Sequence, residues 1–329
     1  MESRRARNGR RARPSRRRPL LYTALATVAV LGATAGGTVY VKAQAHSGEG
    51  AVSSSSAEPS ASASGSADGG VTVESVAAPE VDHDALLAEA MDAVTVPADA
   101  KVSVAVLDVD SGDSATYGSA AFDTASIVKV DILATLLLQA QDAGRDLTTT
   151  EKTYATAMIE NSDNTSASEL WRIIGKAEGL DAANERFGLT NTDGGDDMLW
   201  GLTQTTAADQ LRLLRQVFGD DSELSEASQA YMQGLMQQIA TDQHWGVSAA
   251  ADGSSWALKN GWLARSTTGL WDINSIGRVS SGGRTYLVAV LSKGNATQAK
   301  GISLVETAAK AAVSAFADDT ASATTTATD

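Results

Sequence analysis

The 329-residue sequence has no cysteine and only three histidines. Without cysteine there is no disulfide framework, no thiol nucleophile and no lipid-anchored thiol. His46, His83 and His244 are scattered, and no H-E-x-x-H pattern joins any two of them into a metal site. No G-x-S-x-G turn is present either, which argues against a Ser-His-Asp hydrolase. We therefore expect no metal and no cofactor, and a structural role for His244.

Basic residues are scarce beyond the N-terminus. Nine arginines lie among the first 18 residues, whereas residues 46 to 329 carry 16 basic and 39 acidic residues. A body this acidic is not expected to bind nucleic acid.

Residues 19 to 41 contain no charged side chain over 23 positions, directly after the arginines. This length spans a bilayer, and the arginines would keep the basic segment 1–18 in the cytoplasm. The segment is therefore expected to be a single-pass anchor, with the rest of the chain outside the cytoplasm. The A-Q-A pattern ending at Ala45 leaves open an export signal cleaved there, which would give a secreted protein.

Composition divides the remaining chain. Residues 42 to 79 are rich in Ser, Ala and Gly and are expected to form a disordered tether, and residues 317 to 329 a disordered tail. The folded domain is then 80 to 316, and it is expected to be a monomer.

Within this domain, hydrophobic periodicity predicts α+β structure with an antiparallel sheet. A helix over 84–94 and a strand, turn and strand over 101–118 come first, and the pattern is then helical from about 126 to 245. Three strands follow at 254–264, 270–279 and 284–294, and a helix over 301–317 ends the domain. The order predicts one sheet flanked by the terminal helices, with an inserted all-helical lobe and a cleft between the two.

The helix that opens the insertion carries an unusual pair. Ser126 and Lys129 lie three residues apart at its start, within a run of apolar residues. This spacing puts both on one face. Burial disfavours a charged ammonium, so Lys129 can be the neutral base that activates Ser126, beside the free N–H groups of a helix N-terminus.

Two further triplets follow in order. S-D-N occupies 162–164, after a helix, and K-N-G occupies 259–261, in the first strand after the helical block. The ordered set resembles the signature of the penicillin-recognising serine hydrolases, the class A β-lactamases and penicillin-binding proteins: S-x-x-K, S-D-N and K-T-G. The resemblance covers about 80 to 316 and implies the serine β-lactamase-like fold.

The resemblance also implies roles for individual residues. Ser126 would be the acylated nucleophile, Lys129 its base, and Ser162 a relay that passes a proton to the leaving nitrogen. For substrate binding, Asn164 would hold the side-chain amide of the substrate and Lys259 its carboxylate.

The third triplet also supplies binding groups and contains a departure. The backbone N–H groups of Ser126 and of Trp262, the residue after Gly261, would form the oxyanion hole. Asn260 stands where the family has Thr or Ser. Its side-chain amide can still donate a hydrogen bond to the substrate, but the hydroxyl that would contact the substrate carboxylate is missing. Arg278 would assist with that carboxylate if its strand adjoins Lys259.

The group that would release an acyl-enzyme is a second departure. Class A enzymes carry a glutamate in an E-x-x-L-N loop, which has no match here. The nearest stretch places Asp196 at the acid position, retains Leu199 and has Trp200 in place of Asn. Asp196 is either a deacylation acid or an ordinary loop acid.

The combined prediction is an extracytoplasmic serine hydrolase that forms an acyl-enzyme on Ser126 with β-lactams or related amides. Two alternatives stay open: a D-alanyl-D-alanine peptidase, and a non-catalytic relative that binds cell-wall fragments. The expected partners are a β-lactam or peptidoglycan-derived substrate and the membrane, through residues 19–41.

Overall fold

The computed structural model describes residues 81–326. The predicted basic segment, anchor and tether lie outside these residues. Within 81–326, no helix is both long enough and apolar enough to cross a bilayer.

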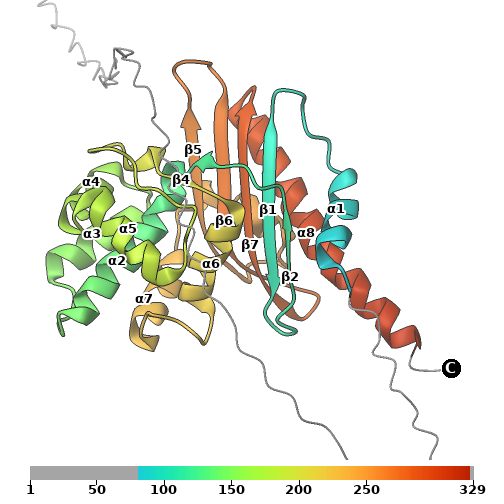
Figure 1. Ribbon diagram of the computed structural model, residues 1–329, viewed down its shortest axis with the longest axis horizontal. Helices are drawn as coiled ribbons and strands as arrows, with labels where there is room; N and C mark the ends of the chain where they lie inside the picture. The colour runs from blue at the N-terminus through green and yellow to red at the C-terminus, as the bar shows by residue number, and fades with distance from the viewer. Residues whose placement is uncertain (1–80, 327–329) are drawn as a thin grey trace, which may run out of the picture. The chain divides into compact units, whose positions relative to one another are not determined.

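Five antiparallel strands form the main sheet, in the order β2-β1-β7-β6-β5 (Figure 1). Both ends of the domain contribute strands, which confirms the predicted sheet. The last strand in this order, β5, has a neighbour on one side only, so it forms an open edge of the sheet. The strand bounds are β1 Lys101–Asp108, β2 Ser114–Tyr117, β5 Trp256–Ala264, β6 Trp271–Ser281 and β7 Arg284–Asn295.

Helices cover both faces of the sheet, as Figure 1 shows. On one face, α8 (Gln298–Thr326) packs across β1, β6 and β7, and α1 (His83–Asp92) packs on α8. On the other face, α6 (Ala207–Phe218) contacts the same three strands. α8 continues to Thr326, although a disordered tail is expected from residue 317. Once a helix is nucleated, each added residue gains one backbone hydrogen bond, so an Ala-rich and Thr-rich stretch can prolong it.

Alternate residues of β7 point to opposite faces of the sheet, and each face packs into a separate hydrophobic core. Ala289 and Leu291 join the core shared with α6 and the helical lobe, whereas Val288 and Val290 join the core under α8. Successive strand residues point to opposite faces, so the buried strand appears in the sequence as a nearly continuous apolar run.

The helical lobe follows the predicted order, with one unexpected strand pair. Its main helices are α2 (Val128–Asp142), α3 (Thr149–Glu160), α4 (Asn164–Ile173), α5 (Lys176–Phe187), α6 and α7 (Glu226–Met236). Two short strands, β3 (Phe122–Asp123) and β4 (Gln204–Thr205), pair antiparallel beside it. Strands of two residues have no hydrophobic period, so the sequence does not reveal them.

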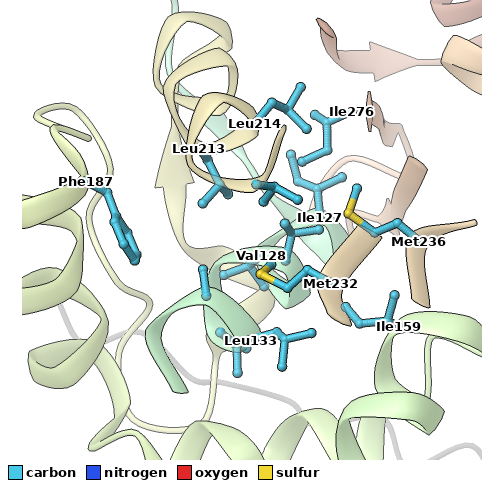
Figure 2. Close-up of a cluster of buried hydrophobic side chains, with 14 of the residues drawn as sticks. Ile127, Val128, Leu133, Ile159, Phe187, Leu213, Leu214, Met232, Met236 and Ile276 are labelled. Carbon is cyan, nitrogen blue, oxygen red and sulfur yellow. The ribbon is translucent and has the colours of Figure 1, made fainter. Parts of the chain in front are cut away.

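The apolar run of α2 is buried on nearly every side. Figure 2 shows Ile127, Val128 and Leu133 surrounded by side chains from other elements, including Met232 of α7 and Ile276 of β6. The helix that follows Ser126 is therefore held rigidly by the core of the lobe.

Candidate active site

Ser126 lies in a tight turn at the start of the lobe. It belongs to the short 3-10 helix η1 (Ala125–Ile127), which continues directly into α2, and it is partly exposed between buried neighbours. Ala125 adopts φ 48°, a left-handed conformation that is strained for a residue with a Cβ. Such strain persists where surrounding contacts over-determine the backbone, and it is frequent at active sites.

The edge strand β5 lies against this turn at Gly261. A methyl group on Gly261 would lie 2.7 Å from the Thr124 carbonyl oxygen and 2.8 Å from the Ser126 amide nitrogen. Only glycine leaves room for the strand to come this close. The backbone after Gly261 therefore runs beside the nucleophile, where the resemblance implies an oxyanion hole.

Lys129 is fully buried on the first turn of α2. Its amine lies 2.7 Å from the Ser162 carbonyl oxygen, 3.0 Å from Ser162 Oγ and 2.7 Å from Asn164 Oδ1. Burial lowers the pKa of Lys129 to about 7, although the nearby Asp163 carboxylate opposes the shift. A substantial fraction of the amine is therefore neutral at physiological pH.

The S-D-N triplet is held at the start of α4. Asp163 caps the helix by accepting a hydrogen bond from the Ser166 amide at 2.6 Å, and this bond lowers the pKa of its carboxyl. Ser162 adopts φ 54°, a second strained position beside Lys129. The cap and this turn direct Ser162 and Asn164 toward the lysine.

Lys259 is also fully buried, on β5. Its amine donates to the Asn260 carbonyl oxygen at 3.1 Å and lies 3.4 Å from Gln243 Oε1. Burial, with a smaller contribution from the charge of Lys129, holds the pKa of Lys259 well below its usual value. The two lysines therefore act on each other electrostatically. The contact between Lys259 and Gln243 was not predicted, because no motif in the sequence singles out Gln243.

The structure corrects the substrate-binding role expected for the Asn260 side chain. Asn260 is fully buried, and its amide donates to the carbonyl oxygens of Gln243 and Trp245 at 2.8 and 2.9 Å. Both N–H bonds are therefore used within the protein. The reason is strand alternation: Lys259 and Gly261 share the lobe face, whereas Asn260 points to the opposite face.

Trp262 shares the face of Asn260. Its ring packs edge-on against Trp245, with centroids 6.0 Å apart. Only the backbone of Trp262 can therefore serve the site. Arg278 lies on β6, which adjoins β5 as the expectation required, but its guanidinium sits over the Phe218 ring at 5.0 Å.

Trp200 lies at the candidate site, although in the sequence it stands out only because it replaces the Asn of the E-x-x-L-N pattern. The Lys129 amine lies over its ring, 5.0 Å from the centroid, and the indole N–H donates to Ser168 Oγ at 3.1 Å. Asp196, four residues earlier, is exposed, and its backbone carbonyl accepts from the Leu199 amide at 2.8 Å. The loop therefore brings an aromatic ring, rather than this carboxylate, to the base.

A second ionisable group is buried on α2, two residues after Lys129. Asp131 is 1% exposed, and the Asn184 side chain is the polar group that acts on its carboxyl. Burial raises the pKa of Asp131 to about 8; Asn184 opposes the shift, and the carboxylates of Asp181 and Asp209 add to it. Asp131 is therefore largely protonated at neutral pH.

Comparison with known proteins identifies the family and the fold. A sequence model described as the beta-lactamase enzyme family matches residues 146–316. No curated protein sequence matches the chain.

Three solved structures illustrate the fold. A mutant of PBP-A, in an acyl-enzyme complex with penicillin G, has a TM-score of 0.61 at 21% identity, over 71% of this chain and 97% of that chain. The TLA-1 extended spectrum beta-lactamase has a TM-score of 0.62 at 15% identity, over 71% and 98%. A class A beta-lactamase from Bacteroides cellulosilyticus DSM 14838 has 0.61 at 16%, over 72% and 99%. At these low sequence identities, the structural matches show a common fold alone.

Proposed function

The chain belongs to the beta-lactamase enzyme family, and from this premise we propose that it is a serine hydrolase that forms an acyl-enzyme on Ser126. The substrates are β-lactams or related peptide amides. One observation carries the proposal: one helical turn after Ser126, a buried lysine with a pKa of about 7 makes hydrogen bonds to Ser162 and Asn164.

The proposed reaction uses Lys129 as a neutral amine. It takes the hydroxyl proton of Ser126 as Oγ attacks the amide carbonyl carbon and forms the C–O bond. Negative charge on the carbonyl oxygen is stabilised by the backbone N–H groups of Ser126 and Trp262. The C–N bond then breaks, and the proton passes from Lys129 through Ser162 to the leaving nitrogen.

Substrate binding uses groups around this centre. Asn164, exposed at the start of α4, receives the side-chain amide of the substrate. Lys259 attracts the substrate carboxylate when its amine is charged, a form that burial disfavours. Because Lys259 is buried and Asn260 is used internally, this attraction acts without a direct hydroxyl partner. We expect weaker carboxylate recognition than a K-T-G strand would give.

Release of the acyl group is proposed to be slow. Activation of water needs a positioned general base, and the exposed Asp196 contrasts with the aromatic cover that Trp200 places over Lys129. This contrast favours a long-lived acyl-enzyme, and with it the second candidate function, a D-alanyl peptidase inhibited by penicillin.

A time course of intact mass tests these proposals. The purified protein is mixed with a labelled penicillin, and the adduct is followed from seconds to hours. An adduct that persists supports the penicillin-binding or peptidase role, and one that disappears within seconds supports a β-lactamase. No adduct at any time, with the penicillin left intact, would contradict acylation and favour the non-catalytic, wall-binding alternative.

The location of the domain is a separate proposal. The 23 uncharged positions at 19–41 support a domain held outside the cytoplasm by a membrane anchor, or secreted after cleavage near Ala45. Protease treatment of intact cells should degrade an anchored domain. N-terminal sequencing of the mature chain distinguishes the two forms, and a domain protected until lysis would contradict both.

A further inference from the structure

Asn274, in the middle of β6, connects the sheet to the turn that carries Ser126. Its side chain is fully buried. The amide donates to the carbonyl oxygens of Asp123 and Thr124 at 2.9 and 3.0 Å, and Oδ1 accepts from the Ser292 amide of β7 at 3.1 Å. Both N–H bonds therefore reach the chain just before the nucleophile.

The anchored segment is the one that needs support. Asp123 and Thr124 directly precede Ala125, which adopts the strained φ of 48°. On its other side, the Thr124 amide donates to the Thr203 carbonyl at 2.9 Å. The turn is thus fixed by β6 through Asn274 and by the segment before β4 through Thr203, and both contacts help to hold the strained conformation.

The close approach of β5 leaves little room for the Thr124 carbonyl to move. The Thr124 carbonyl that accepts from Asn274 is the same atom that a methyl group on Gly261 would approach to 2.7 Å. β5 and β6 pair directly, with Gly261 opposite Asn274. A shift of Thr124 away from β6 would therefore change the distance between the Ser126 turn and the strand that stabilises the oxyanion.

We infer that Asn274 is a positioning residue for Ser126. Its amide holds the two carbonyls before the strained Ala125, so that the Ser126 hydroxyl and amide keep their distance from the backbone that follows Gly261. Asn274 does not touch the reacting atoms and acts through Thr124. The inference rests on the proposed acylation of Ser126.

Asn295 on β7 provides a matched control. It is 1% exposed, and its amide donates to the Trp271 carbonyl and to Ser292 Oγ, both at 3.0 Å. Asn295→Ala removes the same side chain as Asn274→Ala and also two donated hydrogen bonds. Neither of those bonds reaches the Ser126 turn. A general loss of sheet stability would affect both variants alike.

The kinetic test compares Asn274→Ala with Asn295→Ala. Acylation by a fluorescent penicillin is measured over a range of concentrations, which separates the maximal acylation rate from the dissociation constant of the initial complex. Asn274→Ala should lower the maximal rate about 10-fold to 100-fold, because misplacement near 1 Å costs this much. Its dissociation constant, and the rate of Asn295→Ala, should stay within about threefold of the unaltered protein. Equal losses in both variants, or no loss in Asn274→Ala, would overturn the inference.

A second variant and a second readout keep the test decisive. Asn274→Thr suits a strand and cannot reach both carbonyls, so it replaces Asn274→Ala if the latter does not fold. Hydrogen exchange of the segment 122–128 should increase in the Asn274 variant and not in Asn295→Ala. If the unaltered protein forms no penicillin adduct, the proposed function fails, and exchange alone decides the positioning role. Unchanged exchange would then refute it.

Discussion

Two regions meet at Lys129, and they differ in how their polar groups are placed. On the side proposed to form the covalent bond, Lys129 is buried and contacts Ser162 and Asn164 at 2.7 to 3.0 Å. On the side of loop 193–203, the candidate acid Asp196 is exposed, and Trp200 covers the amine instead. The groups proposed for acylation are therefore held in place, whereas the loop offers an apolar cover.

The difference separates two halves of a hydrolytic cycle. Forming an acyl-enzyme needs a nucleophile, a neutral base and an oxyanion hole, all of which depend on burial and fixed backbone. Breaking it needs a water molecule beside a second base. A fold can keep the first set and lose the second, because they lie on separate chain segments.

The largest effect is expected from removing the nucleophile. Ser126→Ala should abolish the penicillin adduct while leaving the thermal unfolding temperature within about 2 °C, because Ser126 is partly exposed and only an oxygen atom is removed. Intact mass and a melting curve measure both. Labelling that survives in this variant would show that another residue is acylated.

The next effect is a dependence of acylation on pH. Lys129 must be neutral to take the proton, and its pKa is about 7. Below that pH the neutral fraction falls about tenfold per pH unit, so the acylation rate should fall likewise, and it should level off above pH 8. Rates measured from pH 5 to 9 test this. A flat profile would exclude Lys129 as the base.

A smaller effect is expected from Trp200. Its ring attracts the charged form of Lys129, a contact of about 0.5 to 1 kcal/mol. Trp200→Leu keeps the apolar cover without the ring, so the midpoint of the pH profile should fall by about half a pH unit. Trp256→Leu is the control, because Trp256 packs against His244. A midpoint that shifts equally in both variants would deny Trp200 this role.

The smallest effect is expected from Asp196. Its carboxylate is exposed, so Asp196→Asn should change the release rate of the penicilloyl group by less than about twofold. The decay of the adduct mass measures this rate. A tenfold slower release would make Asp196 the deacylation acid and remove the contrast between the two regions.

Much of the fold was predictable because it depends on patterns that burial imposes. The apolar runs at 284–294 and after Ser126 predict a buried strand and a buried helix, and both are present. The β3–β4 pair was not predictable, since two-residue strands have no period. The helical continuation to Thr326 was also missed, because composition alone does not report whether a preceding helix is already nucleated.

The placement of the candidate residues was predictable where short spacing determines it. Ser126 and Lys129 lie three residues apart, and the structure has Ser126 in η1 and Lys129 on the first turn of α2, which follows directly. The direction of Asn260 depends on which face of β5 meets the lobe, and this follows only from the assembled sheet. The ring of Trp200 reaches Lys129 through a loop whose path no local pattern describes.

The paired burial of Lys129 and Asp131 on α2 has a consequence for proton linkage. Asp131 holds a proton in the folded state up to about pH 8 that the unfolded chain releases near pH 4, so its contribution to stability falls as pH rises between these values. Lys129 lacks, above about pH 7, a proton that the unfolded chain keeps to about pH 10, so its contribution rises over that range. Lys259, whose pKa burial also lowers, adds to this rise, so the three groups together give a minimum of stability in the neutral range. Melting curves from pH 4 to 10 should show it, and Asp131→Asn should remove the falling limb.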